Sequence, residues 1–69
     1  MRIQTKRGVF DSSAMKIEYE SGRYVLKATE PLGGGIFTHQ YHTTYIEKFE
    51  TYEAAAKYFE ELKERARRW

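Results

Sequence analysis

The segment from Pro31 to Phe49, PLGGGIFTHQYHTTYIEKF, brings together three consecutive glycines, two histidines and two tyrosines. Histidines three residues apart share one face of a helix and could bind a metal ion together, whereas on a strand they point to opposite faces. Residues 36–49 are rich in Thr, Tyr, Ile and Phe and lack Gly and Pro, which favours a strand. We therefore expect His39 and His42 on opposite faces, with no metal site and no cofactor.

The three glycines, Gly33 to Gly35, do not fit a phosphate-binding loop, because Ile36 and Phe37 follow where such a loop needs Lys and Ser or Thr. The serines and histidines lie in no recognisable nucleophile context, and no carboxylates are paired as in an acid–base site. A chain of 69 residues also has little room for a pocket that excludes water. The sequence predicts a binding protein, not an enzyme.

Composition limits the architecture to one small domain spanning residues 1–69. The chain has no Cys, so disulfides and thiolate zinc sites are excluded, and its six Tyr, four Phe and one Trp must supply much of the packing. No apolar run approaches the roughly 20 residues that span a bilayer, and the first residues lack the apolar stretch of a signal peptide. We expect a cytoplasmic protein with no membrane contact.

The last segment predicts an amphipathic helix that begins after Thr51, whose hydroxyl would cap the first turn. Its apolar stripe consists of Tyr52, Ala55, Phe59, Leu62, Ala66 and Trp69. Basic residues gather at the C-terminal end, where the helix dipole favours positive charge, so the basic tail completes the helix.

Two segments with a period of two precede it, 15–20 and 23–28, and Ser21-Gly22 between them suits a two-residue hairpin loop. The loop predicts the pairs Glu20–Arg23, Tyr19–Tyr24, Ile17–Leu26 and Met15–Ala28. Both apolar sets then fall on one face. On the other face Lys16 opposes Lys27, which is repulsive unless an acid such as Glu18, or a ligand, lies between them.

Alternation along the strand expected at 36–49 places an aromatic row toward the helix and a polar row outward. The aromatic row is Phe37, Tyr41, Tyr45 and Phe49. The outward row is Ile36, Thr38, Gln40, His42, Thr44, Ile46 and Lys48. Residues 2–10 predict a first strand of undetermined register. The expected fold is α+β, an antiparallel meander of three or four strands with one C-terminal helix packed on one face.

The junction FETYEAAAKYFEEL, with Phe49, Glu50, Thr51 and the alanines Ala54 to Ala56, resembles two families of DNA-binding domain. These are the arm-binding domains of tyrosine recombinases and the ethylene-response-factor type domains. In both, a three-stranded antiparallel sheet packs on the helix, and its outer face enters the DNA major groove. The resemblance implies that Lys16, Lys27, Gln40 and His42 lie on the DNA-facing side.

Two functions follow. A nucleic-acid-binding module would contact phosphates through basic residues and base edges through Gln40 and His42. Those basic residues are Arg2, Lys6, Lys16, Lys27 and the basic residues of the C-terminal tail. A protein-interaction or inhibitor domain, with a homodimer as one form, would use a sheet edge and the exposed apolar residues Val25, Ile36 and Ile46. The architecture favours the first, and the net charge of only +2 favours the second.

Overall fold

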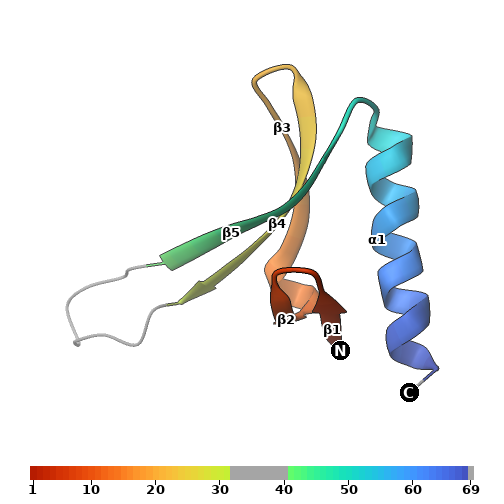
Figure 1. The fold of residues 1–69 in the computed structure, drawn as a ribbon. Coiled ribbons are helices and arrows are strands. Elements are labelled where there is room, and N and C mark those ends of the chain that lie inside the picture. Colours follow the sequence, from red (N-terminus) through yellow and green to blue (C-terminus); the bar gives the residue numbers. More distant parts are fainter. Residues whose placement is uncertain (32–40, 69) are drawn as a thin grey trace.

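A computed structural model describes residues 1–31 and 41–68, and Figure 1 shows an antiparallel α+β arrangement with one C-terminal helix. The predicted fold class is confirmed. The elements are β1 (Arg2–Thr5), β2 (Gly8–Asp11), the 3-10 helix η1 (Ser12–Ala14), β3 (Met15–Glu20), β4 (Arg23–Pro31), β5 (Tyr41–Phe49) and α1 (Tyr52–Arg67).

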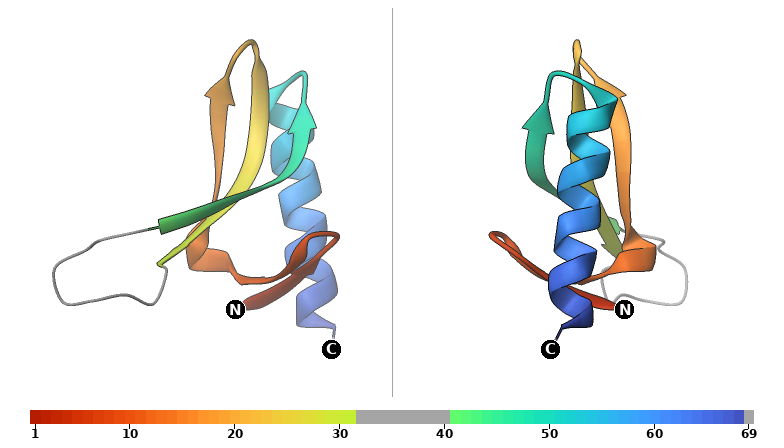
Figure 2. Two further views of the ribbon diagram at one scale, coloured as in Figure 1. Left: turned by 60° about the vertical axis from the view of Figure 1, so that its left-hand side comes forward. Right: turned by 90° about the vertical axis from the view of Figure 1, so that its right-hand side faces the viewer.

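The strands form two sheets. One has the order β1-β2 and the other the order β3-β4-β5, so the last three strands are the predicted meander. Figures 1 and 2 show α1 running along one face of the three-stranded sheet, with the β1–β2 hairpin beside the C-terminal half of α1. The helix therefore contacts both sheets.

The N-terminal segment forms two strands where one was predicted. Thr5 pairs with Gly8 across a turn formed by Lys6 and Arg7. The buried Thr5 hydroxyl donates to the Gly8 carbonyl at 2.7 Å and accepts from the Arg7 N–H at 3.1 Å. Gly8 has a φ of 129°, which L side chains rarely adopt. Lys-Arg is not a typical turn pair, so this hairpin could not be predicted from its turn residues.

The β3–β4 hairpin forms with the predicted register. Ser21 and Gly22 have φ values of 51° and 82°, and a type I′ turn requires positive φ at both positions. The four predicted pairs are all present, from Glu20–Arg23 to Met15–Ala28. The expected opposition of Lys16 and Lys27 is also confirmed.

Strand β5 contains a bulge that changes which side chains face the helix. Leu26 pairs with Glu47 and Lys27 with Tyr45, so Ile46 is the additional residue in β5. Ile46 is only 2% exposed and packs in the core, whereas Tyr45 is 50% exposed. The expectation of an outward Ile46 and an inward Tyr45 is therefore wrong, because one inserted residue shifts the alternation.

The core joins both sheets to the helix. Its buried residues are Ile3, Met15, Leu26, Ala28, Ile46 and Leu62. Phe49 packs against this cluster as predicted, and its ring lies 5.3 Å from that of Tyr58. Tyr41 was expected beside Phe49 on the helix side, but it is 62% exposed, because it precedes the bulge.

The helix begins as predicted, since the Thr51 hydroxyl accepts from the Ala54 N–H at 3.1 Å. Ala55 and Leu62 are buried, and Phe59 and Ala66 are partly buried, which confirms the central part of the apolar stripe. Tyr52 departs from it and is 53% exposed. Trp69 lies outside the described residues. No helix in the described part of the chain is long and apolar enough to cross a membrane.

Candidate functional site

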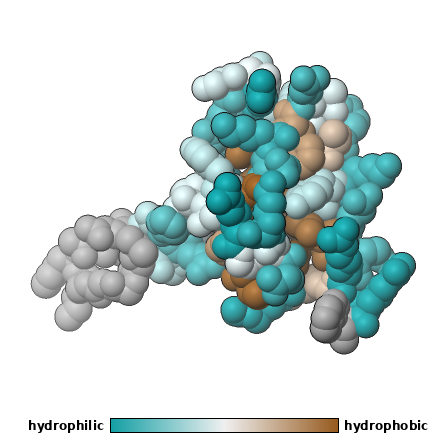
Figure 3. Space-filling view, in the orientation of Figure 1, coloured by the Kyte–Doolittle hydropathy of each residue, from teal (hydrophilic) through white to brown (hydrophobic). Residues whose placement is uncertain are grey.

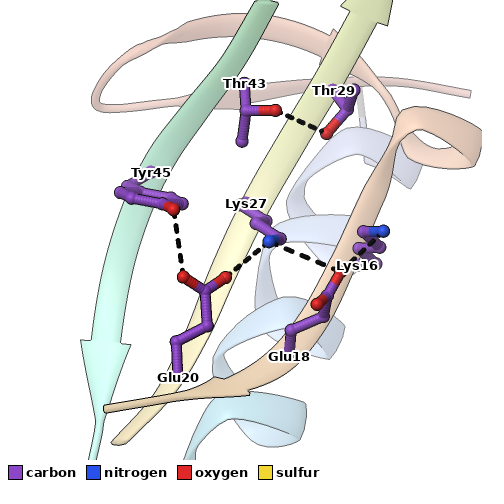
Figure 4. A network of polar contacts seen from close by, with 7 residues as sticks. All are labelled: Lys16, Glu18, Glu20, Lys27, Thr29, Thr43 and Tyr45. Carbon is purple, nitrogen blue, oxygen red and sulfur yellow. Dashed lines mark hydrogen bonds and ion pairs between the residues drawn. The ribbon is translucent and has the colours of Figure 1, made fainter.

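The face of the three-stranded sheet turned away from α1, here called the outer face, contains a polar network that spans all three strands (Figure 4). Residues of this face follow from the pairing of β3, β4 and β5. They are Lys16, Glu18, Glu20, Arg23, Val25, Lys27, Thr29, Thr43, Tyr45 and Lys48.

Lys27 is at the centre of this network. Its Nζ lies 2.5 Å from Glu20 Oε2 and 3.4 Å from Glu18 Oε1, and its side chain is only 12% exposed. The same Glu18 oxygen lies 2.6 Å from Lys16 Nζ. Glu18 therefore separates the two opposed lysines, as the sequence allowed, and lowers their mutual repulsion.

Tyr45 extends the network to β5. Its hydroxyl donates to Glu20 Oε1 at 3.0 Å, and Lys27 Nζ lies 5.7 Å from its ring centroid. One step further along the strands, the Thr29 and Thr43 hydroxyls are 3.1 Å apart. Glu20 thus links β3 to both β4 and β5.

These contacts fix the charge states. The Lys16 ammonium, with help from Lys27, lowers the pKa of Glu18 below its ordinary range. Hydrogen bonds from Lys27 and then Tyr45 lower the pKa of Glu20. Glu20 in turn raises the pKa of both Lys27 and Tyr45. At neutral pH two ammonium groups therefore face two carboxylates, and the network has no net charge.

Val25 lies on the outer face as predicted, but the expectation that it is exposed is wrong, since only 3% of it is accessible. It is on the central strand and lines a hollow of about 270 Å³ with Arg23, Tyr45 and Lys48. The long neighbouring side chains cover it, as aliphatic stems often do. Arg23 and Lys48 are exposed and form no ion pair with the described residues.

The predicted contact residues Lys6 and Arg2 lie away from the outer face. Lys6, in the β1–β2 turn, is paired with Glu47 at the β5 bulge and lowers the pKa of that carboxyl. Arg2 lies on the small sheet and lines a groove beside α1. Gln40 and Ile36 lie outside the described residues, as does His39.

His42 does not lie on the outer face. It pairs with Glu30, one position beyond the Thr29–Thr43 pair, whose side chains lie on the outer face. Because successive side chains of a strand point to opposite faces, His42 lies on the face opposite to Thr43. The implied grouping of His42 with Lys16 and Lys27 is therefore wrong. Because of the bulge, counting back from Phe49 assigned it to the wrong side. Among the described residues, no three His, Cys, Asp or Glu side chains are grouped to hold a metal ion.

Sequence reasoning missed two features of this surface. Tyr45 was assigned to the helix side, and only knowledge of the bulge could have placed it beside Glu20. Glu20 pairs with Arg23 as predicted, but the reach of its carboxylate to Lys27 and Tyr45 was not predicted. The two-residue loop places Glu20 and Lys27 on one face, but Glu20 is opposite Arg23 and Lys27 is opposite Lys16, so the register predicts neither a direct nor a diagonal contact between them.

The chain matches no protein-family model, and no curated protein or solved structure shows significant similarity to it. The resemblance to DNA-binding domains at the junction of β5 and α1 stays a prediction from the sequence.

Proposed function

We propose that this protein is a non-enzymatic module that binds another protein through its outer face. The observation that supports this most directly is the state of Lys27, which is 12% exposed and held by two carboxylates. Phosphate binding depends on cations whose charge is available to the ligand. Lys27 would have to leave Glu18 and Glu20 before it could contact a phosphate.

The remaining residues of the outer face also support a protein partner. Exposed Tyr45 and Arg23 flank the hollow over Val25, and Tyr and Arg are enriched where protein interfaces gain most of their affinity. Arg23 and Lys48 offer two cationic groups beside this hollow. The partner surface that fits supplies carboxylates to these two groups and an apolar side chain against the exposed ring of Tyr45.

A photo-crosslinking experiment in cells of the natural source tests this function. A photoreactive amino acid at Thr43, which is exposed on the outer face, should give protease-sensitive adducts, and the same group at exposed Lys57 on α1 should not. Adding Tyr45→Ala to the Thr43 variant should abolish those adducts. Equal yields from both positions, or adducts that survive Tyr45→Ala, would contradict the proposal. An adduct of twice the chain mass would identify the partner as a second copy.

Nucleic-acid binding is the second candidate, favoured by the cations Arg23 and Lys48 beside the exposed Tyr45 on one sheet face. Bases stack on such aromatic rings, and cations beside them contact the backbone. Titration of a fluorescent mixed-sequence duplex and of a single strand at low and moderate salt tests it. Binding that weakens with salt, with a shallower salt dependence in Arg23→Ala/Lys48→Ala, would favour this candidate over a protein partner.

A further inference from the structure

A second recess lies away from the outer face, between the β1–β2 hairpin and the C-terminal half of α1. It is a groove of about 480 Å³, lined by Arg2, Gln4, Val9, Leu62, Arg65 and Ala66. Leu62 and Ala66 provide an apolar floor from the helix, and Val9, which is 41% exposed, forms an apolar wall. In Figure 3 hydrophobic atoms are visible along the boundary between the sheets and α1.

Two exposed arginines flank this apolar floor, Arg2 from β1 and Arg65 from α1. Asp11 is opposite Arg2 in the pairing of β1 with β2. Its carboxylate instead accepts hydrogen bonds from the Ser13 N–H at 3.0 Å and from the Ser13 hydroxyl at 2.8 Å. Neither arginine forms an ion pair with the described residues.

Neither Glu61 nor Glu64 on α1 forms an ion pair with Arg65. Glu64 pairs with Arg67 at 3.1 Å. Glu61 lines a separate shallow hollow with Arg65 but makes no ion pair with it in the structure. Within residues 1–31 and 41–68 no carboxylate pairs with either guanidinium group, and a guanidinium can bind a ligand carboxylate with two parallel hydrogen bonds.

We propose that this groove binds a short acidic segment of a partner protein, with an apolar side chain on Leu62 and Ala66 and carboxylates at Arg2 and Arg65. Its volume is within the roughly 300–1,000 Å³ of pockets that hold small ligands, so a few residues suffice. The inference rests on the proposed function only in taking the partner to be a protein. It concerns a different surface, so either can fail without the other.

Three acetylated pentapeptides serve as probes for calorimetry and for amide shifts of the isotope-labelled full chain. One alternates aspartate with leucine, the second replaces leucine with serine, and the third replaces aspartate with lysine. We expect binding of the first alone, with shifts confined to β1, β2 and the second half of α1. Equal binding of the serine peptide or of the lysine peptide would overturn the proposal, as would no binding at millimolar peptide.

Matched variants test the two arginines. Arg2→Ala and Arg65→Ala should each weaken binding by about tenfold, the equivalent of about 1.4 kcal/mol for a charged hydrogen-bonded contact. Lys57→Ala, which removes an exposed cation from the N-terminal half of α1, should leave the affinity unchanged. The double variant R2E/R65E should lose the aspartate peptide and bind the lysine peptide.

An oligonucleotide distinguishes the partner classes. A short single strand added to the peptide complex should not displace the peptide from the groove. Displacement, accompanied by shifts in β1, β2 and α1, would show that the groove binds phosphates and would overturn the proposal. Crosslinking from Thr43 is unaffected by Arg2→Ala and Arg65→Ala if the two surfaces are independent, so failure at the groove is distinguishable from failure at the outer face.

Discussion

The β3–β4 hairpin and strand β5 lie in the same sheet, but the sequence predicted them with different success. In the hairpin every predicted pair is present, and Met15, Leu26 and Ala28 of the predicted apolar face are buried, whereas Tyr19 on that face is 63% exposed. In β5 the same alternation assigned Tyr45 and Ile46 to the wrong faces. Strand β5 is the richer of the two in β-branched and aromatic residues, so strand propensity does not explain why its faces were predicted less well.

The difference lies in what fixes the register. A two-residue turn with positive φ at Ser21 and Gly22 allows one pairing of β3 with β4. Strand β5 pairs with β4 across a longer connection, and an inserted residue at Ile46 places a large apolar side chain in the core. Burial of Ile46 stabilises the bulge, although regular alternation would expose this side chain.

The largest expected effect tests the bulge directly. Ile46→Ala should lower the free energy of unfolding by about 3 kcal/mol, as for other large-to-small changes in a core. Tyr45→Ala should cost much less, because half of the side chain is exposed. Urea unfolding monitored by circular dichroism measures both. If Tyr45→Ala proves the more damaging change, β5 has the regular register that simple alternation predicts.

A smaller effect is expected at the hairpin turn. A Cβ at Gly22 would meet no atom within 4 Å, so Gly22→Ala adds no clash and its cost is purely conformational. With φ at 82° that cost should be about 1 kcal/mol. The measurement is the same urea titration. No loss of stability would mean that the turn is not what fixes this register.

Ser21→Asn should act in the opposite direction. Ser21 has a φ of 51°, and Asn adopts this left-handed conformation more readily than Ser, so we expect a gain of roughly 0.5 kcal/mol in the free energy of unfolding. Thermal unfolding of this variant beside Ser21→Ala provides the control, since Ala lacks the advantage of Asn. A variant no more stable than Ser21→Ala would contradict the assigned turn type.

The smallest effect concerns the network that connects the hairpin to β5. The pKa of Glu20 lies below its ordinary value of 4.5 in the folded protein. Its contribution to stability is therefore complete above that ordinary value and is lost as the pH falls through the lower folded-state pKa. Glu20→Gln should lower stability at neutral pH and make the acid-induced loss shallower.

Urea titrations of the Glu20→Gln variant from neutral to acidic pH measure this, with Glu53→Gln on the exposed first turn of α1 as control. An unchanged acid dependence in Glu20→Gln would show that Glu20 does not connect the hairpin to β5 in solution.

The sequence predicted correctly those features that depend on residues close together in the chain. The cap at Thr51, the stripe through Ala55 and Leu62 and the opposition of Lys16 and Lys27 depend on neighbours a few residues away or on one tight turn. Long-range choices were not visible in the sequence. The bulge at Ile46 depends on the space beside Leu26 and Leu62, and the burial of Val25 depends on side chains from all three strands.

In the candidate surfaces, too, the sequence predicted contacts within one hairpin but not contacts between distant segments. The sequence placed Lys16, Lys27 and Glu18 together, because they share one hairpin. It could not place Arg2 beside Arg65, because these residues are at opposite ends of the chain and meet only when β1 packs against α1.

The inclusion of Ile3 and Leu62 in one cluster has a consequence for how the protein is made. A ribosome delivers the first strand long before the helix, and until Leu62 has left the exit tunnel Ile3 cannot be buried against it. The hairpins can form early, because their contacts are local. The hydrophobic core can close only after the helix has emerged, so the contact between β1 and α1 is the last part of this domain to form.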